Sequence, residues 1–359
     1  MDSIAFILPE VKLGACGVSD YALRMATTLA GLGIRCSLLS TEPIEPSRTS
    51  AGVSIGPADA EEALGYELIC IQYVPNLKPE GRRFFSQMAG LRHPKVHLMV
   101  HEFFRISSKE HPLGIRGRIK SRFQLFQLRS LIRKTRPHTI STSNDHYRKT
   151  LSEYGINASV SPMPGTIPIE AEGHEPVELG AAEWFRRKKG EFIWVVFGNL
   201  YTNFWDCAAY FREISRLGES TAESHRWVIC GKQADGEESR FRATASGFAD
   251  SVIFTGPVPA ASVDWLMRNA DASLSGTGGD FWQKSTGVLV ALERGLPIYF
   301  PREKLLSRDF GEPTLYHDLG QLVRDRIRSN GCPPPYQGPH SPRLAAERLL
   351  EIVASISSL

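Results

Sequence analysis

The sequence has no uninterrupted run of about 20 apolar residues, the length that a helix needs to span a bilayer. Its six cysteines are scattered and form no Cys-x-x-Cys pair, so neither a zinc site nor a disulfide framework is indicated. The first ten residues lack the basic segment and the small-residue cleavage site of a secretory signal. These absences predict a globular protein with reduced cysteines in the cytoplasm.

Two common nucleotide-binding patterns are also missing. Gly14 and Gly17 follow the first apolar segment, but the spacing Gly-x-Gly-x-x-Gly does not occur there, which disfavours a dinucleotide-dependent dehydrogenase. A P-loop needs glycine directly before its lysine, whereas Gln283 precedes Lys284. A phosphate site in this chain must therefore be built in another way.

Alternating apolar and amphipathic segments fill the 359 residues, with 42% hydrophobic and 23% charged residues. This alternation is typical of α/β sheets that are open and mostly parallel, and the length suits two domains. A composition change rich in proline and acidic residues marks the boundary. We predict a first domain at 1–168, a linker at 169–190, a second domain at 191–340 and a C-terminal helix at 341–359 that is long enough to cross back to the first.

The segment 272–300 predicts a strand, a glycine-bearing loop, a helix that starts at Lys284-Ser285-Thr286-Gly287, and another strand. The first turn of a helix has unpaired N–H groups and partial positive charge, so it attracts phosphate. Lys284 and the two hydroxyls would add charge-assisted hydrogen bonds. The alternative is that Ser285 or Thr286 merely caps the helix and the glycines merely form a turn.

Polar residues also follow the predicted strands of the first domain. The loop with Gly14 and Gly17 lies where open α/β sheets bind ligands, and Asp20 follows it at the start of a helix. His101 and Glu102 come directly after the strand 96–100 and could bond a substrate hydroxyl or accept a proton. Equally, this pair could only hold the loop that follows.

The stretch from His111 to Asn144 contains no acidic residue and many arginines and lysines. Interleaved apolar residues predict a basic amphipathic helix at 115–136, which could lie on an anionic membrane or face an anionic acceptor. The alternative is a solvated helix that packs on the domain core. Nucleic acid is not an expected partner, because no recognised reader motif accompanies the charge.

Several segments together resemble sugar-nucleotide-dependent glycosyltransferases of family four. They are GACGVSDYALRMATTLAGLGIRCSLLS, IQYVPN with HEFF, SPMPGTIPI, FGNL, VIFTGPVPAASVDWLMRNADASLS and KSTGVLVALERGLPI, in this order over most of residues 1–300. The resemblance implies the α/β fold called GT-B, with two Rossmann-like domains that face each other across a cleft. It also implies a cytoplasmic enzyme, peripheral at the membrane face if 115–136 binds lipid, that moves a sugar from a nucleotide diphosphate sugar to a polysaccharide or a lipid-linked glycan.

The resemblance further implies retention of configuration and no metal or cofactor besides the donor. Together with the strand ends and the helix start described above, it leads to a set of candidate site residues. Donor contacts fall on Gly14, Gly17, Gly198, Asn199, Lys232, Lys284, Ser285, Thr286, Gly287 and Glu293, and His101, Glu102 and Asp20 are the catalytic candidates. Asp20 or Glu102 would be the base if configuration were inverted.

The chain departs from the family pattern at the donor site. The family has arginine after the glycine of the FGNL-like loop, where Asn199 stands, and many members have two glutamates where this chain has Trp282 and Val290; Glu293 is near but out of phase. Either the chain is a divergent member that holds the phosphates with Lys284, Ser285, Thr286 and Lys232, or it is a catalytically silent GT-B-like scaffold or binding protein. A sugar-nucleotide epimerase is a further alternative.

Overall fold

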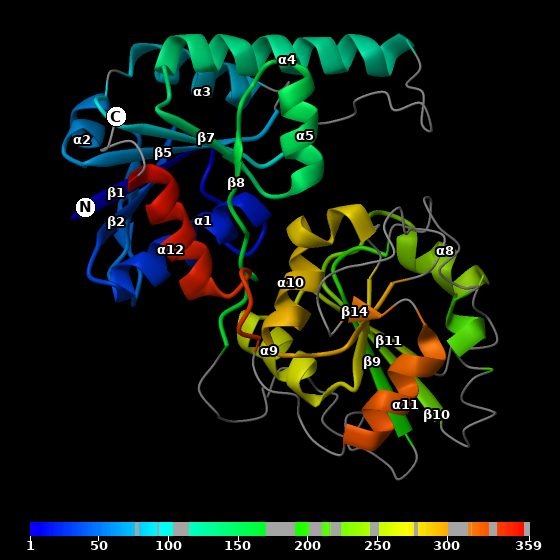
Figure 1. Ribbon diagram of the computed structural model, residues 1–359. Coiled ribbons are helices and arrows are strands. Elements are labelled where there is room, and N and C mark those ends of the chain that lie inside the picture. The colour runs from blue at the N-terminus through cyan, green and yellow to red at the C-terminus, as the bar shows by residue number, and fades with distance from the viewer. Residues whose placement is uncertain are drawn as a thin grey trace. The chain divides into compact units, whose positions relative to one another are not determined.

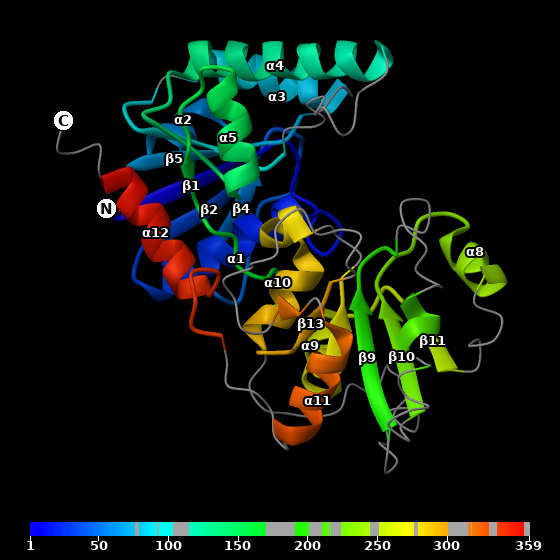
Figure 2. The same ribbon diagram turned by 45° about the vertical axis from the view of Figure 1, so that its right-hand side comes forward.

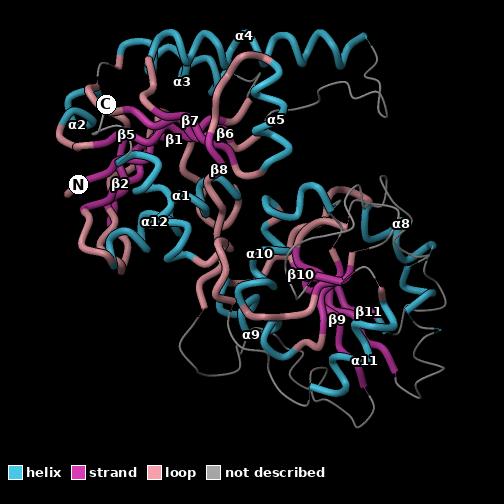
Figure 3. The backbone as a smooth tube through the Cα atoms, in the orientation of Figure 1, coloured by secondary structure: helices cyan, strands magenta, loops and turns pink. Residues whose placement is uncertain are grey.

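The computed structural model describes residues 1–75, 79–91, 93–102, 115–169, 191–200, 210–214, 216, 224–244, 251–275, 279–300, 315–316, 318–329 and 336–354. The chain forms two compact units: unit 1 comprises Met1–Pro164 and Pro342–Leu359, and unit 2 comprises Gly165–Ser341. Each unit has its own sheet with helices packed around it (Figures 1 and 3). The predicted α/β class with two Rossmann-like domains is confirmed. From residue 170 onward, the predicted linker lies outside the described residues.

The sheet of unit 1 has the strand order β3-β4-β2-β1-β5-β6-β7-β8, and only β3 runs antiparallel to its neighbour. Chain order reverses between β1 and β5, which makes their carboxyl ends the switch point where such sheets bind ligands. The strands are β1 Ser3–Leu8, β2 Arg35–Ser40, β3 Ser47–Arg48, β4 Ser54–Pro57, β5 Leu68–Tyr73, β6 Val96–Val100, β7 Thr139–Thr142 and β8 Ser159–Val160.

Helix α1 (Gly17–Gly31) packs on this sheet through Tyr21, Met25 and Leu29, whose spacing places them on one side of the helix. Helix α12 (Pro342–Ala354), from the far end of the chain, packs against α1 and buries Ala345, Leu349 and Val353, among others. The remaining helices of unit 1 are α2 Ala60–Leu64, α3 Pro79–Gly90, α4 Ile115–Thr135 and α5 Asp145–Glu153.

Unit 2 has an entirely parallel sheet in the order β11-β10-β9-β12-β13-β14. Its core is aromatic: the rings of Trp194 and Trp227 stack at 5.1 Å, and Phe211 lies 3.9 Å from Trp227. Chain order reverses between β9 and β12, so the switch point lies there. The strands are β9 Glu191–Phe197, β10 Ser224–Cys230, β11 Val252–Gly256, β12 Ala272–Leu274, β13 Ile298–Tyr299 and β14 Leu315–Tyr316.

The helices of unit 2 flank this sheet (Figure 2). They are α8 Glu237–Thr244, α9 Ala260–Asn269, α10 Thr286–Glu293 and α11 Leu319–Ser329, and a 3-10 helix, η2, covers Gly279–Lys284. Among the helices that the structure describes, none has both the length and the apolar character needed to cross a lipid bilayer.

The last residue of α10 and the residue after it hold the chain that enters unit 2. The carboxylate of Glu293 accepts a hydrogen bond from the Gly165 N–H at 2.6 Å. The Arg294 guanidinium donates to the Pro168 carbonyl at 2.9 Å and pairs with Asp264 at 2.6 Å. These buried polar contacts fix 165–168 to α10, which explains why unit 2 begins at Gly165.

Two buried histidines predict acid sensitivity. His97 bonds Thr139 and Ser141, and His225 accepts a hydrogen bond from the Trp194 indole at 2.9 Å. Burial lowers the pKa of each imidazole to about 4. The unfolded pKa is about 6.5, so the unfolded chain binds more protons between these values, and stability falls as the pH drops from about 6.5 to 4 by up to about 3 kcal/mol per histidine.

Urea unfolding across that pH range tests this prediction. The variant His97→Gln/His225→Gln should show a shallower loss of stability on acidification than the parent, whatever its stability at pH 7. Equal slopes for the two proteins would mean that other groups cause the acid sensitivity.

Candidate functional site

The carboxyl end of β9 lies at the switch point of unit 2, and the loop that follows it depends on glycine. Gly198 has φ of +105°, which is unfavourable for other residues, and its N–H bonds the Cys230 carbonyl at 2.9 Å. The side chain of Gln233 donates to the Gly198 carbonyl and accepts from the Leu200 N–H. Gln233 thus ties together the loops after β9 and β10, bringing Gly198, Asn199 and Lys232 to neighbouring strand ends.

Helix α10 begins against this strand end. Ser285 occupies the N-cap position without a side-chain capping bond, and Thr286 is the first helical residue, which confirms the predicted helix start. A Cβ on Gly287 would come closer than 3.0 Å to the carbonyl oxygen of Phe197, the residue before Gly198. The absent side chain therefore lets the first turn of α10, whose N–H groups have no acceptor within the helix itself, lie directly against the β9 loop.

Charge near this helix start comes from Lys284, the last residue of η2, which is half-buried, as are Ser285 and Thr286. At the two positions where many glycosyltransferases of family four carry glutamate, this chain has the uncharged residues Trp282 and Val290. Trp282 is buried with its ring 4.9 Å from that of His340, and Val290 is fully buried. Both side chains belong to the core of unit 2.

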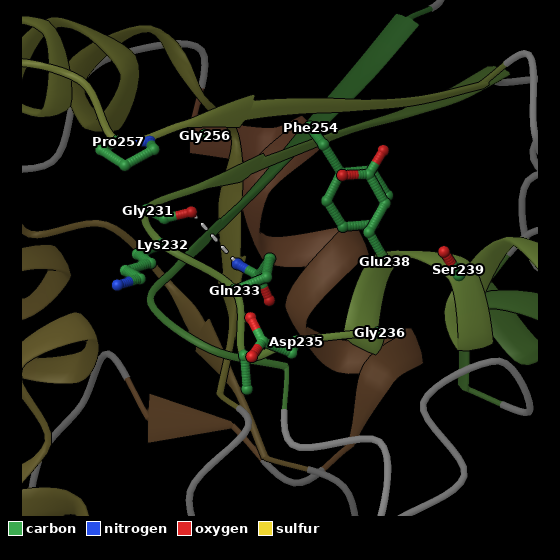
Figure 4. A pocket seen from close by; sticks show the side chains of 11 residues that line it. Gly231, Lys232, Gln233, Asp235, Gly236, Glu238, Ser239, Phe254, Gly256 and Pro257 are labelled. Carbon is green, nitrogen blue, oxygen red and sulfur yellow. Dashed lines mark hydrogen bonds between the residues drawn. The ribbon is translucent and has the colours of Figure 1, made fainter.

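A pocket of about 530 Å³ opens beside the carboxyl ends of β10 and β11. Figure 4 shows Phe254 and Glu238 on one side, Lys232 on the other and Gln233 between them. The Arg242 guanidinium lies over the Phe254 ring, 5.0 Å from the ring centroid, and makes a cation–π contact with it. The pocket combines an aromatic wall with polar groups, which suits a flat heterocycle and a ribose.

Glu293 does not lie at the start of α10, where the phosphate contacts are predicted. It ends that helix, and its carboxylate bonds the Gly165 N–H. A Cβ on Gly165 would lie only 3.0 Å from the Glu293 carboxyl carbon, so the fit is close. We therefore give Glu293 a structural role, in place of the donor contact expected from the sequence.

In unit 1, three elements meet at the switch point. His101 follows β6 and is buried; its Nε2 lies 2.6 Å from the Gln72 side-chain oxygen on β5. Since that oxygen only accepts, Nε2 donates. The Tyr21 ring of α1 packs edge-on at 4.9 Å. Glu102, next in the chain, is half-buried.

Asp20 holds the loop after β1. Its carboxylate accepts from the Gly14 N–H at 2.6 Å, and Gly14 has φ of +72°. Burial raises the pKa of Asp20, and the Gly14 hydrogen bond opposes this rise. Nearby, the Ser19 hydroxyl donates to the Glu10 carbonyl. Gly17 begins α1 and is exposed. Asp20 thus has a clear structural task, and its part in catalysis stays a prediction.

Sequence reasoning assigned no role to Gln233, Gln72 or Tyr21. The signal for the last two was present, because Gln72 lies in the segment IQYVPN and Tyr21 in the glycine-rich opening. Nothing local in the sequence pairs Gln233 with Gly198, 35 residues away.

Comparison with known proteins finds no matching family profile and no matching curated protein. Solved structures do match. Sucrose-phosphate synthase from Thermosynechococcus elongatus is 12% identical with a TM-score of 0.57, and the match covers 100% of this chain and 97% of that one. Anabaena HepE, solved with UDP and glucose, is 12% identical with a TM-score of 0.52, covering 100% and 99%.

A third neighbour is a Listeria monocytogenes protein assigned as a UDP-N-acetylglucosamine 2-epimerase, 10% identical with a TM-score of 0.53, covering 98% and 96%. At these identities the likeness establishes the fold, which is that of GT-B glycosyltransferases. Membership of family four remains a prediction.

Proposed function

We propose that the protein is a glycosyltransferase that moves a sugar from a nucleotide diphosphate sugar to an acceptor glycan. The observation that carries this proposal is the start of α10 at the switch point of unit 2, pressed against the β9 loop by Gly287. A departing diphosphate develops negative charge as the sugar bond breaks, and N–H donors and lysine at that place stabilise it.

The binding site for the donor has two parts, both in unit 2. The nucleoside occupies the pocket beside β10 and β11, and the diphosphate lies at the start of α10 with Lys284, Ser285 and Thr286. Lys232 lines the pocket and is exposed, so it can reach a phosphate oxygen. This division supplies positive charge although Asn199 replaces the arginine of the family.

We assign the sugar and acceptor contacts to unit 1, through the Gly14 loop, His101 and Glu102. The His101 Nε2–H donates a hydrogen bond to the side-chain oxygen of Gln72, and this bond holds the imidazole in one orientation. Retention of configuration, independence of metal and a polysaccharide or lipid-linked acceptor follow the family resemblance and are parts of this proposal. A lipid-linked acceptor would place the protein at the cytoplasmic face of a membrane.

The test is a panel of UDP-, GDP- and ADP-sugars, incubated with and without lipid-linked and polysaccharide acceptors. Acceptor-dependent release of nucleoside diphosphate together with a glycosylated product supports transfer. Conversion of the sugar without acceptor would instead reveal an epimerase, an outcome for which the Listeria neighbour offers a precedent in fold. Binding without any turnover would favour the silent scaffold, which the buried Trp282 and Val290 also suit.

Replacing Lys284 with alanine should weaken binding of the cognate nucleoside diphosphate about tenfold, or ~1.4 kcal/mol, because one charge-assisted bond is lost. Isothermal titration of UDP and GDP measures the change. Lys149→Ala, at an exposed position on α5, is the matched control and should bind like the parent. Unchanged affinity in Lys284→Ala would remove this lysine from the site.

A further inference from the structure

Helix α4 carries an exposed apolar stripe. Ile115, Ile119, Phe123 and Phe126 are 78%, 64%, 46% and 65% exposed. Their spacing of four, four and three residues places all four on one side of the helix. The opposite side packs into unit 1 through buried residues that include Gln124, Leu128, Leu131 and Thr135. The exposed apolar side chains therefore form one continuous patch.

Basic residues border this stripe along both edges. At 100° per residue, Arg118, Arg122 and Arg129 project along one edge, and Arg116 and Lys120 along the other. All five are exposed, and the Arg129 guanidinium donates to the Tyr154 carbonyl at 2.9 Å. Since no acidic residue occurs between His111 and Asn144, the whole helix presents one sign of charge.

Helix α4 lies at the edge of unit 1. Figures 1 and 2 show α4 as a long helix along the margin of unit 1, beside α3, with its N-terminal half extending beyond α5. The stripe occupies that half and, from Ile115 to Phe126, runs for about 16 Å.

The combination selects one kind of partner. The basic side chains could bind the phosphates of a nucleic acid backbone, but the four exposed apolar side chains would then be left in contact with phosphate and water. A lipid surface suits both the apolar stripe and its basic edges. The apolar side chains enter the boundary between headgroups and acyl chains, and the flanking arginines and lysines bind anionic headgroups. We propose that this face of α4, residues 115–129, docks on an anionic lipid membrane.

The proposal concerns unit 1 alone and is independent of the donor site in unit 2. Its failure would leave nucleotide binding and transfer to a soluble acceptor untouched, so the two proposals can fail separately.

Sedimentation with lipid vesicles tests the docking surface. The full chain should bind vesicles of phosphatidylcholine containing about one third phosphatidylglycerol and should not bind pure phosphatidylcholine. Raising the ionic strength from about 0.1 M to about 1 M, which shortens the Debye length from about 10 Å to about 3 Å, should release much of the protein.

Two variants separate the components of the surface. Phe123→Ser/Phe126→Ser should lower the partition coefficient about tenfold or more, because apolar insertion is lost. Lys120→Gln/Arg122→Gln should lower it and reduce its dependence on salt. The matched control is Leu64→Ser/Leu344→Ser, which removes exposed leucines from α2 and α12 and should bind like the parent.

Thermal unfolding should be unchanged in both α4 variants, since the altered side chains face away from the core. The proposal is overturned if the parent protein ignores anionic vesicles, or if the phenylalanine variant binds as well as the leucine control. It is also overturned if the parent is a dimer in analytical ultracentrifugation that the phenylalanine variant dissociates, because the stripe would then bind a second copy.

Discussion

Gly287→Ala is expected to lower the free energy of unfolding by about 1 to 3 kcal/mol and to reduce nucleotide binding more than Lys284→Ala does. The new methyl group would overlap the backbone carbonyl of Phe197, which cannot rotate away as a side chain could. Either α10 or the end of β9 must shift, and the shift displaces both the helix N–H groups and the adjacent Gly198 loop. Urea denaturation and titration with UDP and GDP measure the two effects.

Gly31→Ala provides the matched control, because Gly31 also lies in a helix but a Cβ there would have nothing within 4 Å. Alanine is the better helix former, so this variant should be as stable as the parent or more stable by up to about 1 kcal/mol. If Gly287→Ala behaved like Gly31→Ala, the close approach of α10 to β9 would not exist in solution.

Asp264→Leu should be the most destabilising substitution considered, costing about 3 to 5 kcal/mol. Asp264 is completely buried and accepts from Arg294 Nε at 2.8 Å, while the guanidinium of Arg294 is itself only 2% exposed. Removing the carboxylate takes away the closest anionic partner of the buried Arg294 charge and leaves it with the carbonyls of Val290, Ile167 and Pro168 and the more distant Glu293 carboxylate at 4.0 Å. Arg268, which also pairs with Asp264, is 27% exposed and can turn to water.

The double variant Asp264→Leu/Arg294→Met separates the unpaired charge from the loss of packing. It removes both charges, so it should be more stable than Asp264→Leu alone. An exposed pair provides the comparison: Glu351→Ala, which breaks the contact with Arg348 on α12, should change stability by about 0.5 kcal/mol or less. Equal stability of the single variant and the parent would contradict the assignment of a buried ion pair.

Much of the fold is predictable from local patterns. Strands such as 68–73 and 96–100 are mostly apolar, with one polar residue each, and parallel strands buried on both sides need that character. The helix start at Thr286 could be predicted because serine, threonine and glycine are typical of helix beginnings. The fold class follows from the alternation of such segments.

The site depends on contacts between distant residues, which no local pattern contains. Glu293 has the charge expected of a donor ligand and lies near the family's glutamate positions in the sequence, yet it bonds Gly165, 128 residues away. Trp282 stands where many glycosyltransferases of family four carry glutamate, and its ring packs against that of His340. Likewise, the bond between His101 and Gln72 depends on β5 and β6 being neighbours in the sheet.

The return of α12 to unit 1 has a consequence for biosynthesis. Residues 1–164 leave the ribosome first, but their unit lacks its final helix until all of unit 2 has been translated. The surface of α1 that α12 covers stays open to water throughout that interval. Nascent unit 1 is therefore expected to need protection from aggregation, which a chaperone can supply. Translation that stops near residue 340 would release a chain in which unit 2 is whole and unit 1 is unfinished.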